Sequence, residues 1–86
     1  MQSGTDNAVE KRLANFFVAR EGEGVLAELP VVDLVDRGFL DSLDFVTLAV
    51  FIRREFGVEL DVTDEATGRA MHRFGSLVEL VVRARS

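Results

Sequence analysis

Residues 41–57 read DSLDFVTLAVFIRREFG, in which two aspartates bracket a serine and an apolar run ends at a glycine. This spacing predicts a helix from Ser42 to Phe56, because Asp41 is a preferred N-cap residue and glycine commonly follows the last turn. The predicted helix carries two apolar stripes. The first contains Phe45, Leu48, Ala49, Ile52 and Phe56, and the second contains Leu43, Val46 and Val50, continued by Thr47 and Arg54. One stripe is enough to face a core, so the second is free for another surface.

An earlier helix is predicted from about residue 6 to residue 20, with Thr5 or Asp6 as its N-cap and Gly22 or Gly24 after its end. Its apolar residues recur at the spacing of one helical face. They are Val9, Leu13, Phe16 and Phe17.

Two more helices are predicted beyond Gly57. A short one opens at residues 63–65, TDE, and runs to about Ala70 or Met71. The last begins at Ser76, because residues 76–79 read SLVE and match the capping-box pattern. Its buried face is expected to hold Leu77, Leu80, Val81 and Ala84.

Residues 22–41 lack helical periodicity and contain the only proline, Pro30. They are nevertheless too apolar for a free linker. We expect a long ordered loop over the core, with a helical turn near Val25–Leu29. Residues 31–32 are an alternative strand start, but no second alternating segment offers a partner.

These elements predict an all-α bundle of three main helices and one short helix with a long first loop. We expect residues 1–86 to form one domain with an ordered core over about residues 6–85. No basic and then apolar signal segment opens the chain, and no apolar run approaches the roughly 20 residues that span a bilayer. A cytoplasmic protein without membrane insertion is therefore expected.

Composition excludes several kinds of chemistry. The chain has no cysteine and one histidine, which removes disulfides, thiol nucleophiles and most zinc sites. The net charge is −5, and residues 21–44 hold seven acids and one base. A surface with that balance repels nucleic acid and suits a basic patch on a partner protein, although a solvated acidic loop has the same composition.

Ser42 is the candidate site. With Asp41 as the cap, Ser42 occupies the first helical position and its hydroxyl is expected to face water. Catalysis by this serine is not supported, because His72 lies in a separate polar stretch with no evident acid partner and the G-x-S-x-G pattern is absent. An exposed, unassisted hydroxyl is better suited to being modified. The free amide groups of a helix start favour an anion there, whereas Asp41 and Asp44 oppose it.

The sequence resembles the acyl carrier protein family over about residues 6–85. The matching features are D-S-L-D at residues 41–44, D-x-G at 36–38, R-E-F-G at 54–57, V-x-L at 58–60 and F-G-S-L at 74–77. The resemblance implies an acyl-carrier-like four-helix bundle. Within the family, the run G-F-L-D-S at 38–42 resembles that of free-standing carriers of small acyl or aminoacyl groups more than that of fatty acid carriers.

In that family the motif serine, here Ser42 between Asp41, Leu43 and Asp44, receives a 4′-phosphopantetheine arm from coenzyme A. A separate phosphopantetheinyl transferase attaches the arm, and the arm's thiol holds acyl or aminoacyl groups as thioesters. The resemblance therefore implies a carrier without catalytic activity or a metal. Its partners would be a loading ligase or transferase and the later enzymes of fatty acid, polyketide or nonribosomal peptide synthesis.

The same resemblance makes the predicted central helix the main docking surface, in a chain expected to be monomeric. Residues 42–56 balance to zero charge, so docking is expected to rely on apolar contacts with an acidic margin. The expected docking residues are Leu43, Val46, Thr47, Val50, Phe51 and Arg54, with Asp33 and Asp36. Two alternatives stay open: an aminoacyl or peptidyl carrier loaded by an adenylating enzyme, and a degenerate carrier fold that acts only as an interaction module.

Overall fold

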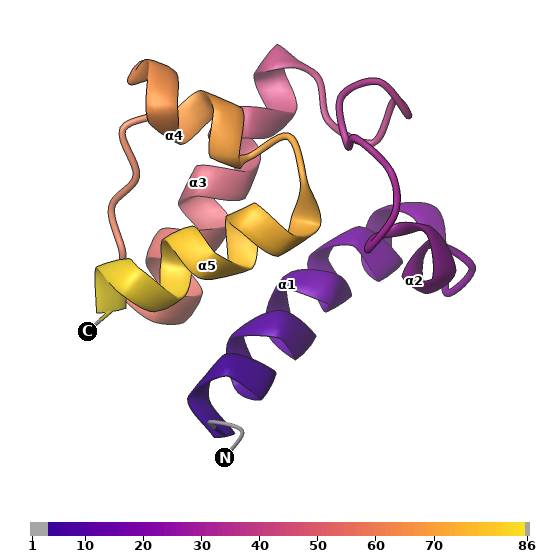
Figure 1. Cartoon of the computed structure of the whole chain (residues 1–86), viewed down its shortest axis with the longest axis horizontal. Helices are drawn as coiled ribbons and strands as arrows, with labels where there is room; N and C mark the ends of the chain where they lie inside the picture. The colour runs from indigo at the N-terminus through magenta and orange to yellow at the C-terminus, as the bar shows by residue number, and fades with distance from the viewer. Residues whose placement is uncertain (1–3, 86) are drawn as a thin grey trace.

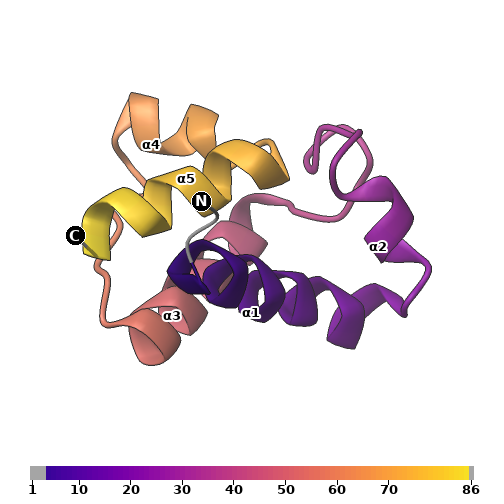
Figure 2. The same ribbon diagram turned by 60° about the horizontal axis from the view of Figure 1, so that its bottom comes forward.

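Three long helices form the bundle in a computed structural model that describes residues 4–85, with side chains from residue 8 onward. They are α1 (Gly4–Glu21), α3 (Ser42–Phe56) and α5 (Phe74–Arg85), and the shorter α2 (Val25–Glu28) and α4 (Glu65–Ala70) lie in the connections (Figure 1). α1 contacts α2, α3 and α5, and α5 also contacts α3 and α4. The rotated view shows α4 and α5 above α1 and α3, with α2 at the other end of the bundle (Figure 2). The fold is thus the predicted all-α bundle.

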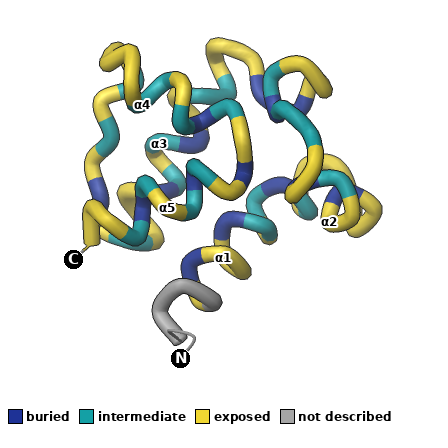
Figure 3. The backbone as a smooth tube through the Cα atoms, viewed as in Figure 1, coloured by how far each residue is buried: buried dark blue, intermediate teal, exposed yellow. Residues whose placement is uncertain are grey.

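The core consists of apolar side chains from every helix except α4 and from both long connections. They are Val9, Leu13, Phe17, Val25, Leu29, Leu34, Phe39, Leu40, Leu48, Ile52, Val58, Met71, Phe74, Leu77 and Val81. The buried positions follow the inward faces of α1 and α5 (Figure 3). Among the described side chains, no polar or charged one is buried, so this core bears no desolvation cost from unpaired polar groups.

The central helix α3 begins and ends where the sequence predicts. The Asp44 N–H donates to Asp41 Oδ1 at 2.9 Å, and the Asp41 N–H donates to Asp44 Oδ2 at 2.9 Å. This reciprocal pair is a capping box in which aspartate replaces the usual glutamate. At the other end Gly57 has φ +69°, a left-handed conformation that glycine adopts without steric cost, and its N–H donates to the Arg53 carbonyl.

The long connection is ordered against the core, as predicted. α2 is the expected helical turn, and Leu34, Phe39 and Leu40 are buried after it. The alternative strand at residues 31–32 does not form. Instead, Asp33 makes a single antiparallel bridge with Arg73.

The predicted start of the last helix is wrong. α5 begins at Phe74, so Ser76 lies inside its first turn and not at its cap. The Ser76 hydroxyl donates to the carbonyls of Ala70 (2.6 Å) and Arg73 (3.1 Å), which joins the end of α4 to the start of α5. Glu79 points away from the helix start and pairs with Arg83. A serine near a helix start has a choice of local backbone partners, and here the acceptors of the preceding turn are the ones it binds.

The expected buried face of α5 is confirmed in part. Leu77 and Val81 are buried and Leu80 is half-buried, whereas Ala84 is exposed, and Phe74 at the start of the helix is buried as well. α1 already has helical backbone at Gly4, before the expected cap at Thr5 or Asp6, and the side chains of those two residues lie outside the described part.

Two leucines on α3 provide a matched test of this packing. Leu48 is fully buried and Leu43 is 77% exposed. We expect Leu48→Ala to lower the free energy of unfolding by about 2–5 kcal/mol, since it leaves a cavity. Leu43→Ala should change it by less than about 0.5 kcal/mol. Urea denaturation followed by circular dichroism measures both, and equal losses would contradict the assigned faces.

Candidate functional site

Ser42 stands at the first position of α3 with an exposed side chain. Its hydroxyl has no hydrogen-bond partner among residues 8–85, whose side chains are described, whereas Asp41 and Asp44 on either side are engaged in the cap. The hydroxyl is thus carried by a fixed backbone but is not used to hold that backbone. A group attached to its oxygen would displace no contact of the fold.

The carboxylate of Asp44 has two partners. One oxygen accepts the Asp41 N–H, and the other forms an ion pair with the guanidinium of Arg20, from the last turn of α1. The Asp41 N–H, together with Arg20, holds the pKa of Asp44 below its ordinary value, against a partial desolvation that raises it. Asp44 is therefore a structural residue of the site and not a free acid.

The Arg20 side chain is itself held in place by an aromatic ring of the same helix. Its guanidinium carbon lies 5.3 Å from the centre of the Phe16 ring, within the range of a cation–π contact. Phe16 packs in turn against Phe51 of α3, with ring centres 5.1 Å apart. These contacts join the end of α1 to α3. The ion pair reaches the first turn of α3, two residues from Ser42, and the ring contact reaches Phe51 further along the helix.

The second apolar stripe of α3 faces outward, as predicted. Leu43, Val46 and Val50 are 77%, 53% and 47% exposed, and Thr47 and Arg54 are exposed beside them. A groove of about 480 Å³ continues this surface between α3 and the following loop. Its lining is Val46, Ala49, Val50, Arg53, Glu59, Leu60, Asp61 and Val62. A larger groove of about 610 Å³ is lined by parts of α1, the segment 26–30 and Phe74, and α3 contributes nothing to it.

Phe51 does not belong to the exposed stripe. It is half-buried and packs on Phe16, so its main contribution is to the contact between α1 and α3. Of the two expected docking acids, Asp36 is exposed, and Asp41 beside Ser42 is exposed as well. The structure therefore groups Leu43, Val46, Thr47, Val50 and Arg54 on the outer face of α3 and sets Phe51 apart from them.

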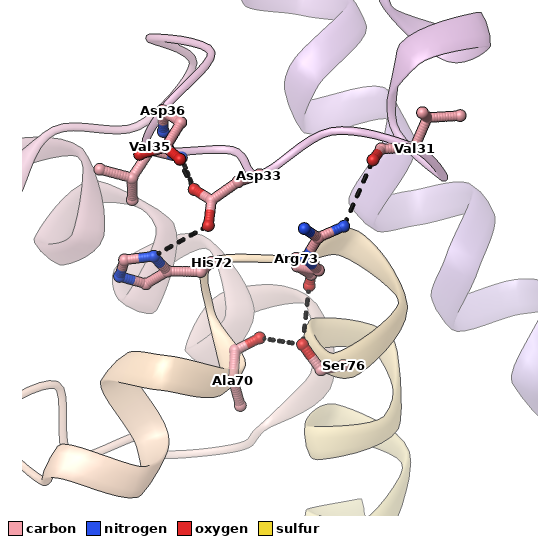
Figure 4. Close-up of polar contacts among 8 residues, drawn as sticks. All are labelled: Val31, Asp33, Val35, Asp36, Ala70, His72, Arg73 and Ser76. Carbon is pink, nitrogen blue, oxygen red and sulfur yellow. Dashed lines mark hydrogen bonds and ion pairs between the residues drawn. The ribbon is translucent and has the colours of Figure 1, made fainter.

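Both carboxylate oxygens of Asp33 are engaged in contacts within the fold (Figure 4). One carboxylate oxygen accepts the N–H groups of Val35 (2.9 Å) and Asp36 (3.0 Å), and the other lies 3.3 Å from His72 Nδ1. The backbone N–H of Asp36 is the main cause that lowers the pKa of Asp33, and His72 and Val35 add to it against partial desolvation. Asp33 thus anchors the long connection and is not a free docking acid.

His72 does have an acid partner, contrary to the sequence-based expectation. The turn between α4 and α5 brings it to Asp33, and its carbonyl accepts the Leu34 N–H at 2.6 Å. Arg73 adds a hydrogen bond to the Val31 carbonyl at 3.3 Å (Figure 4). Neither Asp33 nor His72 is hydrogen-bonded to the Ser42 hydroxyl, so this histidine–aspartate pair does not activate it.

Other site types find no support in the described residues. No group of three or more histidine, cysteine, aspartate or glutamate side chains there is arranged to hold a metal ion. None of the helices described is long and apolar enough to cross a membrane. Comparisons of the chain with family models, with curated proteins and with solved structures each found no match.

The lowered pKa values predict how stability depends on pH. Asp44 and Asp33 bind protons more weakly in the folded state than in the unfolded state, so their contribution is complete above about pH 4 and is lost as the pH falls further. Relative to wild type, Asp44→Asn should be less stable at about pH 5, and the gap should narrow at about pH 3. Urea unfolding at both pH values measures this. Asp36→Asn is the control, because its exposed carboxylate has no hydrogen-bond or ion-pair partner among residues 8–85. A constant gap for Asp44→Asn would contradict the assignment.

Proposed function

We propose that this chain is a discrete carrier protein that holds acyl groups as thioesters on a 4′-phosphopantetheine arm attached to Ser42. The observation that carries the proposal is the exposed, unpartnered hydroxyl at a rigidly capped helix start. A serine that reacts as a nucleophile needs a base within hydrogen-bond reach, and no described side chain provides one for Ser42. A serine that is modified by another enzyme needs only access and a fixed position, and Ser42 has both.

The helix start also suits the chemistry of the arm. Attachment forms a bond between the Ser42 oxygen and the phosphorus of the phosphopantetheinyl group and breaks the pyrophosphate bond of coenzyme A. Adenosine 3′,5′-bisphosphate and the serine proton are released, and a phosphate diester with one negative charge remains on Ser42. Unpaired N–H groups at the first turn of α3 and the positive end of its dipole favour an anion at this position. The arm brings a thiol to a chain that has no cysteine.

The outer face of α3 supplies the docking surface in this proposal. Leu43, Val46 and Val50 form an exposed apolar strip that starts beside Ser42, and Asp36 and Asp41 provide acids at its margin. Exposed apolar side chains beside polar ones are typical of protein docking sites. The proposed partners are a phosphopantetheinyl transferase, a loading ligase or transferase, and downstream biosynthetic enzymes. In this proposal the chain acts as a monomer in the cytoplasm and does not itself catalyse the chemistry of its cargo.

The proposal is tested by incubating the purified protein with coenzyme A and a broad-specificity phosphopantetheinyl transferase. The intact mass should rise by one arm, and Ser42→Ala should abolish the gain. Thr63→Ala is the control, because Thr63 also carries an exposed hydroxyl but lies in the loop after α3, where it donates to the Asp61 carboxylate. It should gain the arm as the wild type does.

The absence of any gain in the wild type would overturn the carrier proposal and favour the interaction module. A gain, followed by loading with an amino acid in the presence of an adenylating enzyme, would identify the aminoacyl or peptidyl carrier instead of the acyl carrier.

The docking surface has its own test in the kinetics of the same transfer. Val46→Asp should raise the KM for this protein by about tenfold with little change in kcat, because it places a charge in an apolar contact. Val31→Asp is the control, since Val31 is 70% exposed but lies outside α3. The wild-type KM should change only a few-fold from low to physiological salt, as expected for a largely apolar contact. Equal effects of the two substitutions would contradict the assigned surface.

A further inference from the structure

We propose that Arg20 is a positioning residue for the modification of Ser42, which makes an anion tolerable at the start of α3 by neutralising Asp44. This inference rests on the proposed function for its biological meaning. Its physical content, a favourable coupling between Arg20 and a negative charge at position 42, can be tested without that function.

The start of α3 is already rich in negative charge. Asp41 and Asp44 lie within three residues of one another, on either side of Ser42. An anion on Ser42 would add a third negative charge to this first turn. The partial positive charge of a helix N-terminus is about half an elementary charge, too little to offset three. A cation in this neighbourhood would therefore reduce the repulsion that an anion on Ser42 meets.

Arg20 is the described cation that lies in this position. Its ion pair with Asp44 brings a full positive charge to the first turn of α3, and both partners are partly shielded, with side-chain exposures of 33% and 19%. The other ion pairs formed by arginines in residues 8–85 lie elsewhere: Arg12 with Glu55, Arg37 with Glu28, Arg53 with Glu59 and Arg83 with Glu79.

The contact is built to hold Arg20 in place. Phe16, one turn earlier on α1, lies under its guanidinium, and Phe51 of α3 supports Phe16. The second oxygen of Asp44 is already committed to the Asp41 N–H. Loss of the arginine would leave the carboxylate in place, because the cap still holds it, but without its counter-charge. The main consequence should be electrostatic, at the position where the arm is attached.

A double-mutant cycle on thermal stability tests the coupling. Ser42→Asp supplies a fixed negative charge at the attachment site, and it is measured alone, with Arg20→Gln and with Arg20→Lys. In low salt, Arg20→Gln should lower the Tm by about 3 °C more in the Ser42→Asp background than in the wild type. Arg20→Lys should restore most of this difference, and high salt should reduce it.

Arg12→Gln is the matched control. Arg12 is also an exposed arginine of α1, but it pairs with Glu55 at the far end of α3, so its effect should add independently to that of Ser42→Asp. If Arg20→Gln is equally additive, the inference is overturned, whether or not the chain is a carrier.

The link to function is measured by the rate of arm attachment. Arg20→Gln should lower kcat/KM for the transferase about threefold or more, with partial rescue by lysine, while Arg12→Gln leaves it unchanged. If the wild type accepts no arm, the proposed function fails, and the Tm cycle still decides the inference. If the arm is accepted equally by wild type and Arg20→Gln, the positioning role is refuted.

Discussion

The reciprocal hydrogen bonds between Asp41 and Asp44 are the interaction on which the rest of this structure depends. They fix where α3 begins, and therefore which side chains of α3 face the core and which face solvent. They also occupy the two acids beside Ser42, so that the hydroxyl between them stays free. Because Asp44 also binds Arg20, the same cap joins the first and third helices. Helix start, core register and candidate site are thus set by one small group of contacts.

The long connection is the second constraint, and it works through a different set of atoms. Asp33 accepts two backbone N–H groups and so turns the chain back on itself. It also contacts His72, which lies in the turn between α4 and α5. Leu34, Phe39 and Leu40 are buried beside this contact. A connection that is anchored in this way presents Ser42 from a fixed backbone. Polar contacts hold the loop, and apolar side chains fill the core beneath it. The Ser42 hydroxyl takes part in neither of these two sets of contacts.

Local patterns predicted most of the fold, and the failures occurred where distant segments meet. Helical spacing identified α1 and α3, and the D-S-L-D motif located both the cap and the exposed serine. The S-x-x-E pattern misplaced the start of α5, because Ser76 binds carbonyls of the preceding turn instead of capping a helix. Arg20 and the partner of His72 were missed for a related reason. Each contact joins residues 24 or 39 positions apart, and no local spacing reports such a pair.

The proposed modification lies on one atom, the Oγ of Ser42. The most direct test is peptide mapping by tandem mass spectrometry of the protein purified from its own cells under conditions that preserve phosphate diesters. We expect a phosphopantetheine arm, free or acylated, on the peptide that contains Ser42 and on no other peptide. Ser42 found unmodified in every preparation, or an arm found at a different residue, would contradict the account.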